Sequence, residues 1–321
     1  MRLKIRDLFF TLVFYLLAFV VGMLVYIYLP FESPLLKLFI ALFAATLIIY
    51  IISLILKYDS LIGPMWGIFP IVASIVFVLD GNHYSVYAIT FAALACLGGI
   101  RYLFFYIYRF VSFRCEDFRM KLLKEKKLGT FLVFLVYLLL PLIEFTAFIP
   151  GFYFINFVAT AEEFAPSFMT IVALLLMLAC IVFEFIADFQ LSMFKRVPAN
   201  DGLVYDRGLW KISRHPNYFF EICYWFSIFL VSFSMPKLIP VLVFCPLAIF
   251  VIIEMFSVKA MDAKESVKPA FKEYYDKTNP ILPIFPPKAL NEVENKMQEV
   301  KEEKTRKKEK KAKEKKANKK K

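Results

Sequence analysis

The chain has little of what soluble enzymes use for metal, phosphate-loop or thiol chemistry. It contains only two histidines, His83 and His215, which excludes a multi-histidine metal site. Its five cysteines are odd in number and no two are spaced like a zinc or redox pair, so we expect reduced packing residues and no metal. It lacks Gly-x-Gly-x-x-Gly, P-loop, Gly-x-Ser-x-Gly and His-Glu-x-x-His motifs. These absences argue against soluble Rossmann, P-loop, serine-hydrolase and zinc-protease mechanisms.

Charged residues are also scarce, and long apolar runs take their place. Of the 321 residues, 21% are charged, 60% are hydrophobic and 18% are aromatic, which is too apolar for a soluble globule. A helix needs about 20 mostly apolar residues to cross a hydrocarbon core of about 30 Å. We therefore expect an all-α, polytopic integral membrane bundle of about eight transmembrane helices. The candidate stretches are 8–29, 35–56, 61–79, 84–108, 129–156, 168–194, 217–235 and 238–257.

The distribution of positive residues predicts the orientation. Lys and Arg precede the first stretch and fall in every second connection, whereas connections 30–34, 80–83 and 157–167 have none. By the positive-inside rule, both termini face the cytoplasm, across the inner membrane if the source is bacterial. The first apolar run is too long for a secretory signal and lacks a small-residue cleavage site, so we expect it to remain as the first helix.

Three regions follow from this pattern. Residues 1–128 hold the first four helices and a basic loop, 129–287 hold the remaining helices, and 288–321 form a Lys/Glu-rich tail. The tail has 15 Lys and Arg against 7 Glu, which accounts for +8 of the net charge of +12. It cannot bury a core, and we expect it to be mobile and to bind anionic lipid head groups. No aromatic residues are interleaved, so we expect no specific nucleic-acid partner.

A polar segment, Asp206 to Glu221, stands directly before an apolar run. Arg214 and His215 offer positive donors suited to phosphate or carboxylate groups. The following Pro216 suits the first turn of a helix, which would place Asn217 and Glu221 four residues apart on one face. The free N–H groups of that turn add positive potential. The sequence therefore predicts an anion site that opens from the cytoplasm into the bilayer.

Ionisable residues also occur inside the apolar stretches. Glu184 and Asp188 lie four residues apart, so they share a helix face and need a cationic partner or a proton. Arg101 either extends to the cytoplasmic surface or lies, with Tyr102, beside a cofactor or substrate oxygen. Glu144 lies between two prolines at membrane depth, and we assign it no role.

Three segments resemble a known family. The run Gly-Leu-Trp-x-x-Ser-Arg-His-Pro-Asn-Tyr-x-x-Glu (208–221) resembles the signature of bacterial membrane proteins with the steroid 5α-reductase C-terminal domain, and more distantly sterol reductases and isoprenylcysteine and phospholipid methyltransferases. Glu-Asp-Phe-Arg (116–119) is similar to the Glu-Asp-Trp-Arg of the reductase-like branch. Glu-Phe-Ile-Ala-Asp-Phe-Gln-Leu (184–191) is similar to its Glu-x-Ile-Ala-Asp-x-Gln-Leu segment.

The resemblance implies a pocket for NADPH in a reductase or for S-adenosylmethionine in a methyltransferase. Asp188 would contact the cofactor, and Lys195, Arg214 and His215 would hold its phosphates. Asn217, Tyr218 and Glu221 would orient the ribose, amide and nicotinamide, with Glu221 counted among the catalytic residues. We expect Tyr102 to hydrogen-bond the developing enolate oxygen. The C-terminal Tyr-x-x-Tyr-x-x-x-Thr ending of the family, here Tyr274 or Tyr275 with Thr278, would cover the pocket.

The leading hypothesis is an NADPH-dependent membrane reductase that acts on a C=C bond conjugated to a carbonyl in a lipid-soluble substrate. Its rival is a methyltransferase that uses S-adenosylmethionine on a lipid or prenylated acceptor, since the Arg-His-Pro-x-Tyr core is common to both. A non-catalytic scaffold is the third reading, because Phe220 stands where the family has Gly and Phe118 replaces Trp.

Overall fold

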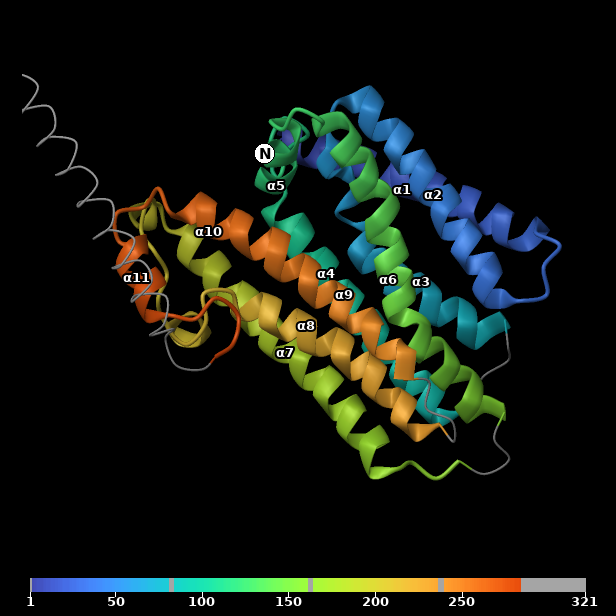
Figure 1. Cartoon of the computed structure of the whole chain (residues 1–321). Coiled ribbons are helices and arrows are strands. Elements are labelled where there is room, and N and C mark those ends of the chain that lie inside the picture. Colours follow the sequence, from blue (N-terminus) through green and yellow to red (C-terminus); the bar gives the residue numbers. More distant parts are fainter. Residues whose placement is uncertain (1, 81–83, 161–163, 236–239, 284–321) are drawn as a thin grey trace, which may run out of the picture.

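The computed structural model describes residues 2–80, 84–160, 164–235 and 240–283, and the tail predicted over 288–321 lies outside these ranges. Within them the regular secondary structure is entirely helical, as the sequence predicts (Figure 1). The main helices are α1 (Arg2–Tyr28), α2 (Pro34–Leu56), α3 (Met65–Asp80), α4 (Val86–Arg109), α6 (Gly129–Thr160), α7 (Phe168–Arg196), α8 (Pro216–Leu230) and α9 (Phe244–Ile252). Shorter helices are α5 (Phe118–Lys124), α10 (Lys259–Glu265) and α11 (Phe271–Lys277).

Seven of the described helices are long and apolar enough to cross a membrane, rather than the eight expected. The expected stretch 217–235 is the exception. Its α-helix, α8, has 15 residues and continues as a 3-10 turn over Val231–Ser234. The last span is longer than expected, because α9, a π-helical segment (Ile253–Val258) and α10 form one apolar helix from Phe244 to Glu265. The protein is an integral membrane helical bundle.

Local sequence explains where several helices begin and end. Pro216 occupies the first turn of α8, as predicted. Ser33 caps α2 by accepting a hydrogen bond from the Leu36 N–H. Ser167 and Thr170 form a reciprocal capping box at the start of α7. The ends of these helices are therefore fixed by short-range chemistry that is readable in the sequence.

Helices α1 and α2 form a pair at one side of the bundle (Figure 1). Many large apolar side chains of α1 are exposed, as expected for a helix that faces lipid. The inner part of the bundle consists of α3 packed on α4 and α7 packed on α8, with α6 in contact with α3, α4 and α8. A short α8 is tolerated there because neighbouring helices surround it.

Helices α3 and α4 approach each other closely because glycines face each other. A Cβ added at Gly67 would lie 2.8 Å from the carbonyl oxygen of Gly99, and one added at Gly99 would collide with the carbonyl oxygen of Gly67. Small residues allow such backbone approach in membrane helices. This contact brings the start of α3 against the last turns of α4.

The N-terminus, α5, α10 and α11 lie at the same end of the bundle (Figure 1). Lys4 donates a hydrogen bond from Nζ to the carbonyl of Tyr108 (3.0 Å), and the Phe113 N–H donates to Asp7 Oδ2 (3.0 Å). Helix α10 packs on α5. The basic connections predicted to share one side of the membrane are therefore close together.

The candidate functional site

Arg101 lies at the centre of a buried cluster of charges. Its guanidinium forms ion pairs with Glu184 (2.8 Å), Asp188 (3.2 Å) and Glu221 (3.1 Å). We call these four residues the Arg101 cluster. All four are buried, and they come from α4, α7 and α8. Glu184 and Asp188 therefore have the cationic partner that the sequence predicted. That partner is Arg101 of α4.

The Arg101 cluster has more acidic than basic groups. Its three carboxyl groups face Arg101 and the half-exposed Arg109, whose Nη1 lies 3.3 Å from Asp188. Buried charges are costly unless they are balanced, so one excess negative charge favours a bound proton or a cationic ligand. The site is therefore suited to chemistry in which positive charge arrives or forms.

Indole groups hold Glu221 in place. Trp66 Nε1 and Trp225 Nε1 both donate to Glu221 Oε1, at 2.6 and 2.8 Å, while Arg101 donates to Oε2. The third tryptophan of the chain, Trp210, donates to the Ala187 carbonyl (3.0 Å). All three indole N–H groups thus donate to acceptors in or beside the predicted site. None of these roles was predicted from the sequence.

Asn217 links the 206–221 motif to the Arg101 cluster. Its Nδ2 donates to Asp188 Oδ1 (3.2 Å), and its buried Oδ1 has no hydrogen-bond partner among the described residues. The start of the motif also contacts α7, because the Leu209 N–H donates a hydrogen bond to Gln190 Oε1 (3.2 Å). Asp188, predicted from the 184–191 segment, and Asn217 and Glu221, predicted from the 206–221 motif, are therefore brought together.

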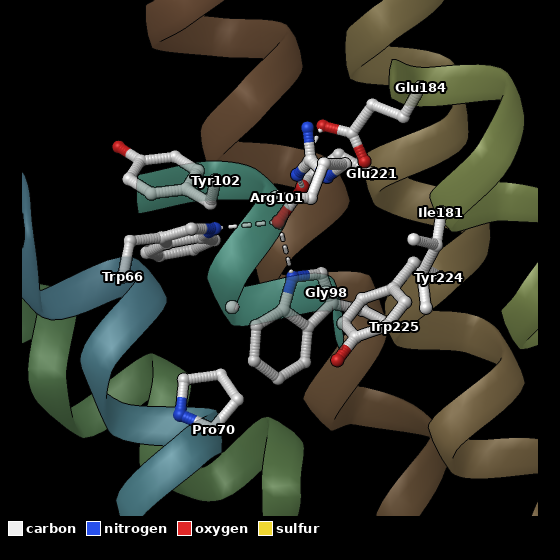
Figure 2. Close-up of a pocket in the computed structure, with 11 residues that line it drawn as sticks. Trp66, Pro70, Gly98, Arg101, Tyr102, Ile181, Glu184, Glu221, Tyr224 and Trp225 are labelled. Atoms are coloured by element: carbon white, nitrogen blue, oxygen red, sulfur yellow. Dashed lines mark hydrogen bonds and ion pairs between the residues drawn. The ribbon is translucent and has the colours of Figure 1, made fainter. Parts of the chain in front are cut away.

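A small pocket lies beside this cluster, between α3, α4, α7 and α8 (Figure 2). Its free space is about that of one water molecule. The Tyr102 ring lines it, but the Tyr102 hydroxyl points away from Arg101 and Glu221. Phe220, the departure from the family pattern, does not line this pocket and stacks on Phe183. The lining residues are Trp66, Pro70, Gly98, Gly99, Arg101, Tyr102, Ile181, Glu184, Glu221, Tyr224 and Trp225.

Arg214 and His215 lie in a different contact network. Arg214 Nη2 and His215 Nε2 bind the two carboxylate oxygens of Asp262, at 2.8 and 2.9 Å. Arg214 Nη1 donates to the carbonyls of Tyr275 and Thr278, and its guanidinium lies 3.9 Å from the centre of the Tyr275 ring. Because these donors are already engaged inside the protein, Arg214 fastens the C-terminal segment onto the motif.

Backbone contacts complete this attachment. The Arg214 and His215 N–H groups donate to the carbonyls of Asn279 and Pro280, at 2.8 and 3.0 Å. The Tyr274 hydroxyl donates to the Trp210 carbonyl. Burial raises the pKa of Tyr274, although nearby Arg214 lowers it in part. The C-terminal segment therefore lies against the motif, as the family's ending would imply.

Four positive side chains, three exposed and Arg119 half-buried, lie beyond the start of α8. We call Arg109, Arg119, Lys195 and Lys264 the cationic rim. Lys195 contacts Glu265 (3.4 Å) and is near Lys264. Burial lowers the pKa of Arg119, but Asp117 and Tyr218 raise it by more. Tyr218 also stacks on His215, with ring centres 5.2 Å apart. The rim and Tyr218 lie together, and Arg109 joins the rim to Asp188.

Among the residues of the described ranges, no group of three or more His, Cys, Asp and Glu side chains is arranged to hold a metal ion. A model of the family described as "Protein of unknown function (DUF1295)" matches residues 49–278. This match includes every predicted site residue. Neither the comparison with curated proteins nor the comparison with solved structures gives a match.

Proposed function

Because the chain belongs to the family described as "Protein of unknown function (DUF1295)", we propose its function from the geometry of the site. We propose an integral membrane reductase that uses NADPH to saturate a C=C bond conjugated to a carbonyl in an apolar substrate. The pairing of Asp188 and Glu221 with Arg101, and the hydrogen bond from Asn217 to Asp188, carry this proposal. These residues come from the two longest segments that resemble the steroid 5α-reductase C-terminal domain. We also propose that both termini face the cytoplasm and that the tail binds anionic lipids.

The described side chains have the chemistry that NADPH requires. Its phosphates would bind the cationic rim, where the side chains of Arg109, Arg119 and Lys195 are between one third and one half exposed. The unpartnered Asn217 Oδ1 would accept a hydrogen bond from the carboxamide or ribose. Arg214 and His215 would act indirectly, by fixing Tyr218 and the covering segment. The pocket is smaller than a nicotinamide ring, so binding requires its side chains to move apart.

NADPH supplies a hydride, and the protein orients the substrate that receives it. With NADPH bound, the β-carbon would take the hydride, the π electrons of the C=C bond would move toward the carbonyl, and an enolate of the substrate would form. A proton from water then adds to the α-carbon, so the balance is substrate, NADPH and one proton giving reduced substrate and NADP⁺. When its three carboxyl groups are ionised, the Arg101 cluster carries excess negative charge, which would favour the positive nicotinamide as the hydride leaves.

The same charge excess supports a second candidate. The sulfonium of S-adenosylmethionine is a cation, and the Trp66 and Trp225 rings, 5.7 Å apart, provide faces that attract cations beside the carboxylate of Glu221. In that case the enzyme would transfer a methyl group to a lipid acceptor. The positive side chains of the rim favour NADPH, which carries phosphate groups, over S-adenosylmethionine, which carries none.

Cofactor binding to the purified full chain tests these alternatives. We expect NADPH to bind by calorimetry and the affinity to fall at least tenfold in Asn217→Ala and in Arg119→Gln. Asp201→Asn, an exposed change in the loop after α7, is the matched control and should bind as wild type does. Binding of S-adenosylmethionine alone would replace the reductase by a methyltransferase. If neither NADPH nor S-adenosylmethionine binds, a non-catalytic membrane scaffold is the remaining candidate.

A further inference from the structure

One polar group of the pocket has no structural role that the described residues can explain. Tyr224 is 5% exposed, and its hydroxyl has no hydrogen-bond partner among them. Burying a hydroxyl without a partner is unfavourable, so phenylalanine would suit the packing better. A tyrosine here is explained if its hydroxyl binds a ligand.

The surrounding residues leave space for this hydroxyl. Tyr224 packs across α4 at Gly98, where an added Cβ would lie 2.8 Å from the hydroxyl oxygen. Its ring meets Trp225 edge to face, with centres 5.6 Å apart. Figure 2 shows the hydroxyl beside the Trp225 ring, on the side of the pocket lining away from Arg101 and Glu221. Because Gly98 has no side chain, the Tyr224 phenol has room to lie within the lining of the pocket.

The other donors of the pocket are less suited to a substrate oxygen. The indole N–H groups of Trp66 and Trp225 are occupied by Glu221. Arg101 has an unpartnered Nε, but its guanidinium is held by three carboxylates. The hydroxyl of Tyr102, which the sequence suggested for this task, points away from the cluster. Among the described lining residues, Tyr224 has a fully buried neutral hydroxyl without a hydrogen-bond partner.

The neighbours of Tyr224 indicate which ligand fits. Pro70, Ile181 and the Trp225 ring are apolar, and they line the same pocket. A ketone or enone carbonyl on an apolar skeleton would satisfy the phenol and bury its hydrocarbon on these side chains. We propose that Tyr224 is the catalytic residue that donates a hydrogen bond to the substrate carbonyl oxygen, in a space that Gly98 keeps free. The proposal rests on the reductase function, since this oxygen gains negative charge when hydride reaches the β-carbon.

Tyr224→Phe separates this role from a structural one. For NADPH oxidation with apolar enones, we expect kcat/KM to fall roughly 10²-fold, as for loss of one donor to an oxyanion. The melting temperature should be unchanged or higher, because only an unpartnered hydroxyl is removed. Gly98→Ala should lower kcat/KM in the same way by displacing the hydroxyl. Tyr15→Phe is the control: its hydroxyl donates to the Leu61 carbonyl (2.6 Å), so stability should fall and kcat/KM should remain.

A measurement without NADPH distinguishes failure of this inference from failure of the proposed function. Infrared difference spectra would be recorded for ¹³C=O-labelled cholestan-3-one and 2-pentadecanone bound to the purified protein in nanodiscs. We expect the carbonyl stretch of at least one ketone at lower frequency in wild type, and a return toward the hydrocarbon-solvent value in Tyr224→Phe. The proposal is overturned if wild type shows no lowered band, or if Tyr224→Phe keeps the band or the wild-type kcat/KM.

Discussion

At the scale of single residues, the Arg101 cluster combines contacts that sequence could suggest with contacts that it could not. The i, i+4 spacing of Glu184 and Asp188 predicted a paired face, and the cluster confirms it. Trp66 and Trp225 were missed because their role depends on Glu221, and Trp66 precedes it by 155 residues. The one available signal was that the chain has three tryptophans, two of them within or beside the polar motif.

Arg214 provides the first test at this scale. Replacing it by Gln leaves half-buried Asp262 without its guanidinium partner and frees two carbonyls, so we expect a loss of roughly 3–5 kcal/mol of stability. Thermal unfolding in detergent measures this, with exposed Arg207→Gln as the control, expected within about 0.5 kcal/mol of wild type. Wild-type stability together with lost NADPH binding would instead assign Arg214 to the cofactor phosphates.

Asp117 gives a pH-dependent test. Burial raises its pKa, but Arg119 lowers it by more, through an ion pair at 2.9 Å, and the net pKa is below the ordinary 3.8. A lowered folded pKa means that the carboxylate stabilises the fold above the unfolded pKa and that this contribution is lost as pH falls through the folded pKa. Asp117→Asn can still cap α5, so it removes mainly the charge.

We therefore expect the difference in melting temperature between wild type and Asp117→Asn to be constant near neutral pH. It should shrink as pH falls below about 4, where wild type loses the Asp117 carboxylate charge that the variant lacks at every pH. Exposed Asp201→Asn should show little difference at any pH. A difference between wild type and Asp117→Asn that does not depend on pH would show that the Arg119 pair does not stabilise the fold.

At the scale of helices, the contact between α3 and α4 sets the position of the pocket. A Cβ at Gly99 would collide with the Gly67 carbonyl oxygen and lie 2.7 Å from Ile71 Cγ1. Gly99→Ala should therefore cost about 1–3 kcal/mol by overpacking and should shift Trp66 away from Glu221. We expect lower thermal stability together with weaker NADPH binding.

Gly22→Ala is the matched control for this change. It also lies in a membrane helix, but the nearest atom to its added Cβ, the Ala41 carbonyl oxygen, would be 3.3 Å away. It should change stability less and leave NADPH binding unaltered. Equal effects of the two substitutions would show that the α3–α4 contact has no special part in the site.

At the scale of the whole molecule, hydropathy predicted the fold class and seven of the eight spans. The remaining stretch, 217–235, is apolar enough, but its α-helix ends at Leu230. Apolar composition alone cannot distinguish a short helix enclosed by α6, α7 and α9 from one that meets lipid. The attachment of Arg214 to Asp262 was also unpredictable, because it depends on how α10 folds back onto the motif.

The predicted site is thus one continuous arrangement of two parts that Arg109, a member of the rim, joins. The Arg101 cluster lies between α4, α7 and α8, the cationic rim lies at the end of the bundle that carries α5 and α10, and Arg109 connects them. An apolar substrate would enter from lipid and a charged cofactor from water. This separation of access routes is the physical reason for placing such a reaction in a membrane fold.

Hydride transfer itself is the most direct test of this account. Purified full-length protein in nanodiscs would be incubated with NADPH deuterated at the transferable C4 position and a panel of apolar cyclic and linear enones. We predict one deuterium at the β-carbon of a reduced product, stoichiometric NADP⁺, and at least a hundredfold lower rate in Tyr224→Phe. Absence of deuterium from every product, with NADPH bound but unchanged, would contradict the reductase assignment.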